Sequence, residues 1–504
     1  MTAIRRSLAA CALAALATSA MPAGAADLSV VRTLPKPVAG GVPWSARDIA
    51  SLRKDLAKAM KGPALRGAHV GLLAIDTARG TTLVAQNADD AFQPASNFKL
   101  LVGSTALERL GPSFAFQTQV LAAGTIADGT LTGDLYLRGG GDVHLNAKDL
   151  DDAAAAIAKA GLTRITGQVV GDASRYDDQR YPDGWDYDDL PWDYAPVVTA
   201  LSFDENVLHL YISPGAAPGE AGVLRADPVT AAITLDNRLT TGEPGSKDTS
   251  VLTRPWDQPR TIRIGGSYPF GAKESGDIRP AAPDPAELAV AVFTQALATH
   301  GVTVVGGSQT GGVAPAGATV LWTHASEPMP EYMADFWWPS DNLVGELFLK
   351  EIGAATAGLP GTSENGAKAE RAFLSSIGVD PGTVTIADGS GLSNYDRITP
   401  RALVAILQHD WNGPNRELVL EALPVAGVSG TLRNAYKGTP AEKNVFAKTG
   451  SISHVRTVSG FIRTKRHGAV TFSFLVNDWI DQAPHASERL AIVRGAVLSE
   501  FVTH

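Results

Sequence analysis

Cysteine is almost absent from this chain of 504 residues, and its one copy, Cys11, lies in the apolar N-terminal segment. Without paired cysteines there is no disulfide framework, and removal of that segment would also leave no thiol nucleophile. Stability must therefore come from packed apolar cores, for which the hydrophobic content of 44% is ample. At this length we expect two or three domains.

Positive charge is also scarce. Lys and Arg number 43 against 52 Asp and Glu, and the basic residues form no patch or run interleaved with aromatic side chains. An acidic surface repels a phosphate backbone, so the composition argues against nucleic acid as a partner. The ten histidines are scattered, and we expect His69, His144 and His454 to be surface or hydrogen-bonded residues. The sequence predicts no metal site and no cofactor.

The N-terminus has the pattern of a secretory signal peptide. Two arginines precede an apolar stretch from Ser7 to Met21, and small residues at positions 23–25 offer a cleavage site. We expect cleavage after Ala25, so that residues 1–25 are removed. The remaining residues contain no second apolar run long enough to span a bilayer. The sequence therefore predicts an exported protein with no membrane span in its mature chain.

Predicted helices and strands place an α+β pattern at both ends of the chain. A helix at 45–61 and a hairpin at 68–87 precede an apolar helix that ends near Leu110. Near the C-terminus, three antiparallel strands between 444 and 477 are followed by a helix at about 483–502. This order predicts an antiparallel sheet flanked by helices.

The middle of the chain has a different pattern of predicted secondary structure. Residues 114–320 consist mainly of short β-like runs separated by Gly, Asp and Pro, with few helical patterns. We therefore expect residues 26–113 and 321–504 to form one domain and residues 114–320 to be a large, mostly β insert. Within the insert we expect a nested β subdomain near 201–277.

The first chemical signal is a serine placed one helical turn before a lysine. Residues three apart share a helix face, so the Ser96 hydroxyl and the Lys99 amine can come within hydrogen-bond reach. We take Ser96 as a candidate nucleophile and Lys99 as its base. The spacing alone proves little, because Ser51 and Lys54 repeat it on a strongly charged segment.

Two distant motifs can complete an acyl-transfer site. Ser340-Asp341-Asn342 stands at a predicted helix start, where plain helix capping is the alternative explanation. Lys448-Thr449-Gly450 lies on a predicted strand and offers a positive charge, a hydroxyl for a carboxylate and room for a substrate. Alone, it is more simply a surface lysine at a strand end. Ser363-Glu364-Asn365 repeats the spacing of the first motif, but we reject it because we expect it in a glycine-rich loop.

Together and in this order, the three motifs resemble the signature of penicillin-binding proteins and serine β-lactamases. Four more segments narrow the resemblance to the class C low-molecular-mass D-alanyl-D-alanine carboxypeptidase/endopeptidase family, peptidase family S13: Leu137–Asp142, Asp388–Ser393, Gly430–Arg433 and Lys437–Pro440. The resemblance covers nearly the whole mature chain. It implies a penicillin-binding-protein/β-lactamase-like transpeptidase domain, with a large insert between the first two motifs.

The resemblance implies a role for each motif residue. Ser96 attacks the carbonyl between two D-alanines while Lys99 removes its proton. Ser340, together with Lys448, relays a proton to the leaving amine. Asn342 holds the substrate amide and orients the base.

The resemblance also implies the substrate contacts. Thr449 and Ser451, beside Gly450, bind the terminal carboxylate, and the backbone amides of Ser96 and Ser451 form the oxyanion hole. Water then hydrolyses the acyl-enzyme. A penicillin mimics the D-Ala-D-Ala end of the substrate and is trapped at the acyl stage.

The side of the site that receives the acyl group is implied in the same way. Ser390, Leu392 and Asn394 line the pocket, and the family commonly carries a basic residue where Asn394 stands. In the insert, Trp185 and Asp188 are candidates to receive the free ammonium of a diaminopimelate side chain. A solvated acidic loop is the alternative reading of that segment.

The sequence thus predicts a periplasmic serine DD-peptidase that acts on peptidoglycan stem peptides, on D-alanyl cross-links, or on both, and that β-lactam antibiotics acylate. A β-lactamase or esterase of the same fold would share the motifs, but no added deacylation carboxylate is evident. A non-catalytic peptidoglycan-binding protein is disfavoured because all the catalytic positions are filled. A Ser-His-Asp hydrolase lacks its Gly-x-Ser-x-Gly elbow.

Overall fold

A computed structural model of the chain describes residues 28–228, 233–480 and 485–504. The predicted signal peptide and its cleavage site lie outside these residues. Within them, no helix combines the length and the apolar character needed to cross a bilayer.

A five-stranded antiparallel sheet unites the two ends of the chain. Its strand order is β17-β18-β19-β1-β2. The strands are β1 (His69–Asp76), β2 (Thr82–Gln86), β17 (Val445–Ile452), β18 (Val455–Arg463) and β19 (Ala469–Asn477). The predicted hairpin and the three predicted C-terminal strands therefore lie in one sheet, with β1 paired to β19.

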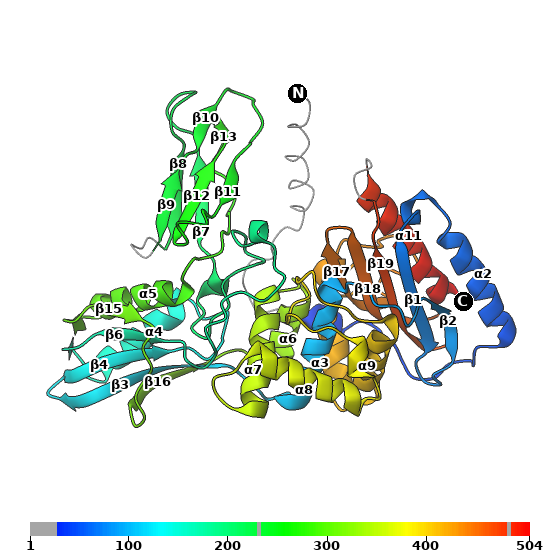
Figure 1. The fold of residues 1–504 in the computed structure, drawn as a ribbon, viewed down its shortest axis with the longest axis horizontal. Coiled ribbons are helices and arrows are strands. Elements are labelled where there is room, and N and C mark those ends of the chain that lie inside the picture. The colour runs from blue at the N-terminus through cyan, green and yellow to red at the C-terminus, as the bar shows by residue number, and fades with distance from the viewer. Residues whose placement is uncertain (1–27, 229–232, 481–484) are drawn as a thin grey trace.

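Helices cover both faces of this sheet (Figure 1). On one face lie α2 (Ala46–Ala59) and α11 (Ala486–Thr503), whose Leu56 and Phe501 belong to the same buried apolar cluster as Phe472 of β19. The other face carries a group of helices, two of which begin at the first two motifs. The group comprises α3 (Lys99–Arg109), α6 (Met329–Trp337), α7 (Asn342–Ala357), α8 (Ser363–Ser376), α9 (Pro400–Asn412) and α10 (Arg416–Ala422). A short helix, α1 (Ser29–Arg32), packs near them.

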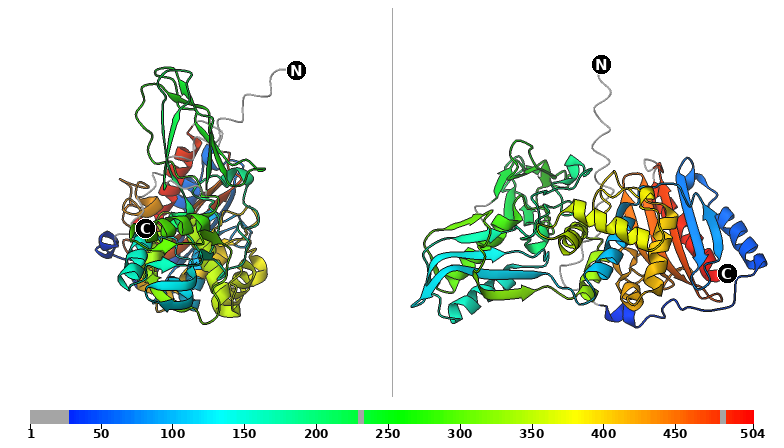
Figure 2. Two further views of the ribbon diagram at one scale, coloured as in Figure 1. Left: turned by 90° about the vertical axis from the view of Figure 1, so that its left-hand side faces the viewer. Right: turned by 60° about the horizontal axis from the view of Figure 1, so that its bottom comes forward.

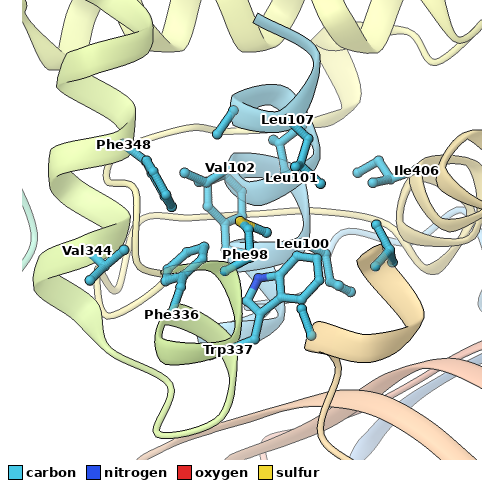
Figure 3. Packing of buried hydrophobic residues seen from close by; sticks show 14 of the residues in the cluster. Phe98, Leu100, Leu101, Val102, Leu107, Phe336, Trp337, Val344, Phe348 and Ile406 are labelled. Atoms are coloured by element: carbon cyan, nitrogen blue, oxygen red, sulfur yellow. The ribbon is translucent and has the colours of Figure 1, made fainter. Parts of the chain in front are cut away.

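Helix α3 lies at the centre of the second layer, and it is buried from Lys99 to Leu107. Figure 3 shows its apolar side chains packed among residues of α6, α7 and α9, namely Phe336, Trp337, Val344, Phe348 and Ile406. Nine consecutive buried residues point in every direction around the helix axis, so this helix belongs to the core. This packing fixes the position of the residues at its N-terminus, which include Ser96.

A second sheet forms the core of the inserted region and lies at the opposite end of the molecule (Figure 1). Its strands are β3 (Gln117–Ala127), β4 (Thr130–Arg138), β5 (Arg164–Ile165), β6 (Val169–Asp172), β14 (Thr303–Val304), β15 (Ser308–Thr310) and β16 (Thr319–Ala325). Helices α4 (Ala147–Lys159) and α5 (Pro285–Thr299) pack on it. Because β16 pairs with β3, this sheet extends past residue 320. The division into domains stays a prediction.

Short strands project beyond that sheet, as Figures 1 and 2 show. They are β7 (His209–Ser213), β8 (Val223–Asp227), β9 (Thr234–Asn237), β10 (Thr240–Gly242), β11 (Val251–Thr253), β12 (Thr261–Gly265) and β13 (Ser267–Pro269). All lie within the range 201–277, where we expected a nested β subdomain. Their pairings are β7 with β8, β10 with β13, and β12 with both β9 and β11.

One local expectation is wrong. Ser363-Glu364-Asn365 does not lie in a loop but begins α8. The preceding Thr362 accepts a hydrogen bond from the backbone N–H of Asn365, so it caps the helix. This capping threonine outweighs the glycine-rich sequence that surrounds the segment.

Candidate active site

The predicted nucleophile and base are in contact. Ser96 lies in the 3₁₀ turn η3 (Ala95–Phe98), and Lys99 begins α3 directly after it. The Lys99 Nζ is 3.0 Å from the Ser96 Oγ. It also donates to the Oδ1 of Asn342, at 2.5 Å, and to the backbone carbonyl of Ser390, at 2.7 Å. Three separate segments therefore converge on one amine.

The two other acceptors determine what this amine can do for the serine. A neutral amine has two N–H bonds and one lone pair. The carbonyl of Ser390 can only accept a hydrogen bond, and Asn342 presents its oxygen because its Nδ2 donates to the backbone carbonyl of Tyr194, at 2.7 Å. With both N–H bonds so engaged, the lone pair of Lys99 is left for the hydroxyl of Ser96.

The surroundings of Lys99 favour that neutral form. The side chain is fully buried, and burial lowers its pKa from 10.5 to about 8, against the opposite effect of Asp388 and three other acidic residues. A lysine with a pKa near 8 is partly deprotonated at neutral pH and can accept a proton.

A second buried lysine faces the second motif. The Lys448 Nζ donates to the Ser340 Oγ, at 2.7 Å, and to the backbone carbonyl of Thr449, at 2.9 Å. Burial lowers the pKa of Lys448 well below 10.5, and the charge of Lys99 lowers it further. The helix-capping explanation applies to Asp341 alone, which accepts from the Val344 N–H at 2.9 Å.

Strand β17 passes close to the nucleophile. A Cβ at Gly450 would lie 2.9 Å from the Ser96 nitrogen and 2.7 Å from the Pro94 oxygen, so a side chain there would collide with the turn. The Thr457 hydroxyl on the neighbouring strand donates to the same Pro94 oxygen, at 2.7 Å. Glycine is therefore required for this approach, which brings the backbone of β17 beside the backbone amide of Ser96.

The two residues predicted to bind a carboxylate, Thr449 and Ser451, lie on the part of β17 that is exposed to solvent. Thr449 is partly exposed and its hydroxyl is 2.7 Å from the hydroxyl of Thr431, so the two form a pair. Ser451 is exposed on the same strand. Both hydroxyl groups are accessible to a ligand that enters beside Ser96.

The loop at 388–394 contributes backbone more than side chains. The Asp388 carboxylate accepts hydrogen bonds from the N–H groups of Ser390, Gly391 and Ser393 and from the Ser390 hydroxyl. Ser390 therefore turns its hydroxyl inward and offers its carbonyl to Lys99. Leu392 is partly exposed.

A segment of the insert reaches this loop. The Trp185 Nε1 donates to Asp388, at 2.9 Å, and the Asn394 Nδ2 lies 3.1 and 3.2 Å from the two carboxylate oxygens of Asp186. Asp188 is exposed on the turn η4 (Tyr187–Asp189), and among the described residues no hydrogen bond joins it to the other predicted site residues. The insert therefore borders the site through Trp185 and Asp186.

Sequence reasoning missed three contributors. Tyr194 contributes its backbone carbonyl, which any residue type could supply and which no sequence motif predicts. In the acidic segment, the sequence indicated Asp188, whereas Asp186 makes the contact with Asn394. Thr431 stands in a segment that supported the family resemblance, and its pairing with Thr449 depends on the tertiary fold. The one sequence feature that could have indicated Thr431 is its hydroxyl group within the Gly430–Arg433 segment.

Comparisons with known proteins found a matching family and similar sequences. The model of the D-Ala-D-Ala carboxypeptidase 3 (S13) family matches residues 52–496. A D-alanyl-D-alanine carboxypeptidase of Actinomadura sp. (strain R39) is 36% identical over 498 residues, which cover 95% of this chain and 91% of that protein. The D-alanyl-D-alanine carboxypeptidase DacB of Haemophilus influenzae is 25% identical over 415 residues, or 82% of this chain and 86% of that protein.

Solved structures give the fold. The crystal structure of penicillin binding protein 4 (dacB) from Haemophilus influenzae matches with a TM-score of 0.80 at 22% identity, and covers 91% of this chain and 100% of that chain. A crystal structure of the same protein complexed with a novel β-lactam matches with a TM-score of 0.75 at 23% identity, with the same coverage. The predicted penicillin-binding-protein fold is confirmed.

Proposed function

This chain belongs to the D-Ala-D-Ala carboxypeptidase 3 (S13) family, and we propose that it is a serine DD-peptidase in which Ser96 forms the acyl-enzyme. The observation that carries this proposal is the set of three contacts around Lys99. The Oδ1 of Asn342 and the carbonyl oxygen of Ser390 accept hydrogen bonds from the Lys99 amine, and burial lowers the pKa of this amine to about 8. A neutral amine held in this way is a general base directed at the Ser96 hydroxyl.

Acylation then proceeds by nucleophilic attack. As the Ser96 Oγ bonds to the carbonyl carbon between two D-alanines, its proton passes to the Nζ of Lys99. The negative charge on the carbonyl oxygen is stabilised by the backbone N–H groups of Ser96 and Ser451. The close approach of β17 at Gly450 supports this pairing of donors from two segments.

Departure of the terminal D-alanine requires a proton for its amine nitrogen. We assign that transfer to the Ser340 hydroxyl, which gives its proton to the amine and takes another from Lys448, whose Nζ donates to it at 2.7 Å. Thr449 and Ser451 bind the terminal carboxylate of the substrate. Water then attacks the ester carbonyl, and the free acid and the Ser96 hydroxyl are regenerated. With a β-lactam the acyl stage persists.

The proposed substrates are the stem peptides and the D-alanyl cross-links of peptidoglycan, in the periplasm. On the acyl side, Ser390, Leu392 and Asn394 border the pocket. The neighbouring Trp185 and Asp188 are proposed to receive a free ammonium group of the stem peptide. The hydrogen bonds from Asn394 to Asp186 support acidic rather than basic character on this side.

Mass spectrometry after treatment with benzylpenicillin tests the mechanism. The intact protein is expected to gain the mass of one penicillin, and peptide mapping should place the adduct on Ser96. Ser96→Ala should show no adduct, whereas Ser51→Ala should be labelled like the wild type. An adduct on any other residue, or none, would overturn the proposal. Digestion of D-Ala-D-Ala-terminated and cross-linked muropeptides then measures the carboxypeptidase and endopeptidase activities.

A further inference from the structure

Four metal-ligating side chains meet at the junction between the insert sheet and α6, away from the candidate active site. Asp142 and His144 follow strand β4, His324 lies on β16, and Glu327 comes just after it. The Nδ1 of His144 is 3.2 Å from an Oε2 of Glu327. The Nε2 of His324 is 3.4 Å from the Oδ2 of Asp142.

These separations fit a tetrahedral metal centre. With metal-to-ligand distances of about 2.0–2.1 Å, the ligand atoms of a tetrahedron lie about 3.3 Å apart. Both measured pairs are close to that value. In addition, one ligand atom each from Asp142, His144 and Glu327 lie within 4.8 Å of one another. His324 lies outside this group of three and contacts Asp142, so its side chain would have to move inward for all four residues to bind one ion.

The Asp142 carboxylate gives independent evidence for a ligand. Its side chain is only 1% exposed, yet Oδ2 accepts no hydrogen bond. The contact with His324 has the distance of an ion pair without the alignment of a hydrogen bond. The other oxygen, Oδ1, is already used by the backbone N–H of His144, at 3.1 Å. The ion pair with His324 is thus the interaction that this oxygen makes in the described part of the chain, and a divalent ion bound between the two side chains would replace it.

We propose that Asp142, His144, His324 and Glu327 form a binding site for a divalent transition-metal ion, with Zn²⁺ as the best-suited ion. Two imidazoles and two carboxylates favour zinc over calcium or magnesium, which prefer an all-oxygen set. The four ligands would give the closed coordination typical of a structural site. The site goes beyond the peptidase reaction and does not depend on it.

The place of the site in the fold indicates its purpose. Strands β4 and β16 flank β3 on either side, and β16 leads directly into α6. The Val143 N–H donates to the hydroxyl of Tyr332 on α6, at 3.0 Å. A metal ion here would tie both strand ends together beside the helix that precedes Ser340. The ion would thus hold the insert against the α-helical part of the catalytic region.

Protonated imidazoles are the alternative to a metal ion. His144 pairs with Glu327 and His324 pairs with Asp142, so each carboxylate already has an imidazole as its partner. Either two protons or one divalent ion can supply the positive charge, and the two possibilities give opposite results when zinc is added.

Zinc binding by the mature full-length protein distinguishes them. The protein is stripped with a chelator, dialysed against Zn²⁺ and analysed for metal content. One zinc per chain is expected in the wild type, and none in His144→Gln or His324→Gln. The control is His504→Gln, because His504 with Asp55 and Glu500 is another candidate group among the described residues. That variant should keep the zinc.

A second measurement covers the case in which a variant fails to fold. Co²⁺ added to the stripped wild type should give the intense visible absorption of a tetrahedral site, and Zn²⁺ should raise the melting temperature. Absence of zinc binding, an octahedral cobalt spectrum, or zinc that survives both histidine substitutions would each overturn the proposal. Loss of zinc in His504→Gln instead would do the same.

Discussion

Two helical segments of this chain carry a serine three residues before a lysine, and their surroundings differ in almost every respect. On α2, Ser51 and Lys54 are both exposed to solvent. At the start of α3, Lys99 has no exposed surface and contacts the Ser96 hydroxyl, the Asn342 amide and a backbone carbonyl. The spacing is identical, so the chemistry must come from the surroundings.

The difference shows what turns a tetrapeptide into a reactive pair. Burial withdraws the amine from water and lowers its pKa, and acceptors from α7 and from the 388–394 loop fix its direction. Both acceptors lie far from Lys99 in sequence. The exposed pair on α2 lies on the opposite side of the five-stranded sheet, where such segments do not meet (Figure 1).

The largest effect is expected from removal of the buried amine. Lys99→Met keeps the length and the packing of the side chain but removes the base, so the acylation rate should fall by about 10²–10⁴-fold. Lys54→Met should leave the rate unchanged. The measurement is the second-order rate constant for acylation by a fluorescent penicillin. A similar loss in both variants, or a loss below tenfold in Lys99→Met, would contradict the comparison.

The approach of β17 gives the next effect. In Gly450→Ala the new methyl group would lie 2.9 Å from the Ser96 nitrogen and 2.3 Å from the Thr457 hydroxyl, so β17 must move away. Since the proposed oxyanion donor, the backbone N–H of Ser451, lies on this strand, we expect the acylation rate to fall by about 10²-fold.

Gly276→Ala is the matched control for that substitution. A Cβ at Gly276, in the insert, would meet no atom within 4 Å, so the rate should not change. Circular dichroism and the melting temperature of both variants separate a local displacement from unfolding. If Gly450→Ala acylated at the wild-type rate, the close approach would have no role in catalysis.

The pH dependence tests the pKa of the buried amine. Below about pH 8 Lys99 is mostly protonated and cannot accept the serine proton, so the acylation rate should rise with pH. A group with a pKa of about 8 goes from roughly one-tenth to nine-tenths neutral between pH 7 and 9, which predicts about a tenfold increase. The profile is measured by stopped-flow acylation of the wild type. Lys54→Met should reproduce it, whereas a flat profile would show that Lys99 is not the titrating base.

The sequence could predict which side chains meet, because the three motifs consist of residue types that acyl-transfer chemistry requires; the roles of these residues stay proposals. Ser96, Lys99, Ser340, Asn342 and Lys448 do converge as the three motifs required. The strands of the five-stranded sheet were predictable too, since they are rich in β-branched, aromatic and other apolar residues and are bounded by turns. In both cases local residue patterns carried enough information.

Backbone contributions could not be predicted in this way. The backbone carbonyl of Ser390 contacts Lys99, and that of Tyr194 contacts Asn342. Neither contact depends on the type of side chain, so the sequence does not predict it. The pairing of β16 with β3 joins segments almost 200 residues apart and moves the insert sheet past residue 320. Such contacts depend on tertiary packing, which overrides local pattern.

The smallest expected effect concerns the stability of α2, which depends on Ser45 and not on Ser51. Ser45 accepts a hydrogen bond from the Asp48 N–H and completes a capping box, while Ser51 is exposed within the helix. Ser45→Ala should destabilise the first turn by about 1 kcal/mol. Amide hydrogen exchange in α2 should then quicken by about fivefold, since that is the factor which such an energy produces.

Ser51→Ala should leave exchange in α2 nearly unchanged, because an exposed serine replaced by alanine loses no structural contact and gains helix propensity. Neither substitution should alter acylation by penicillin. Faster exchange in Ser51→Ala than in Ser45→Ala would mean that the second Ser-x-x-Lys pair has a structural role after all.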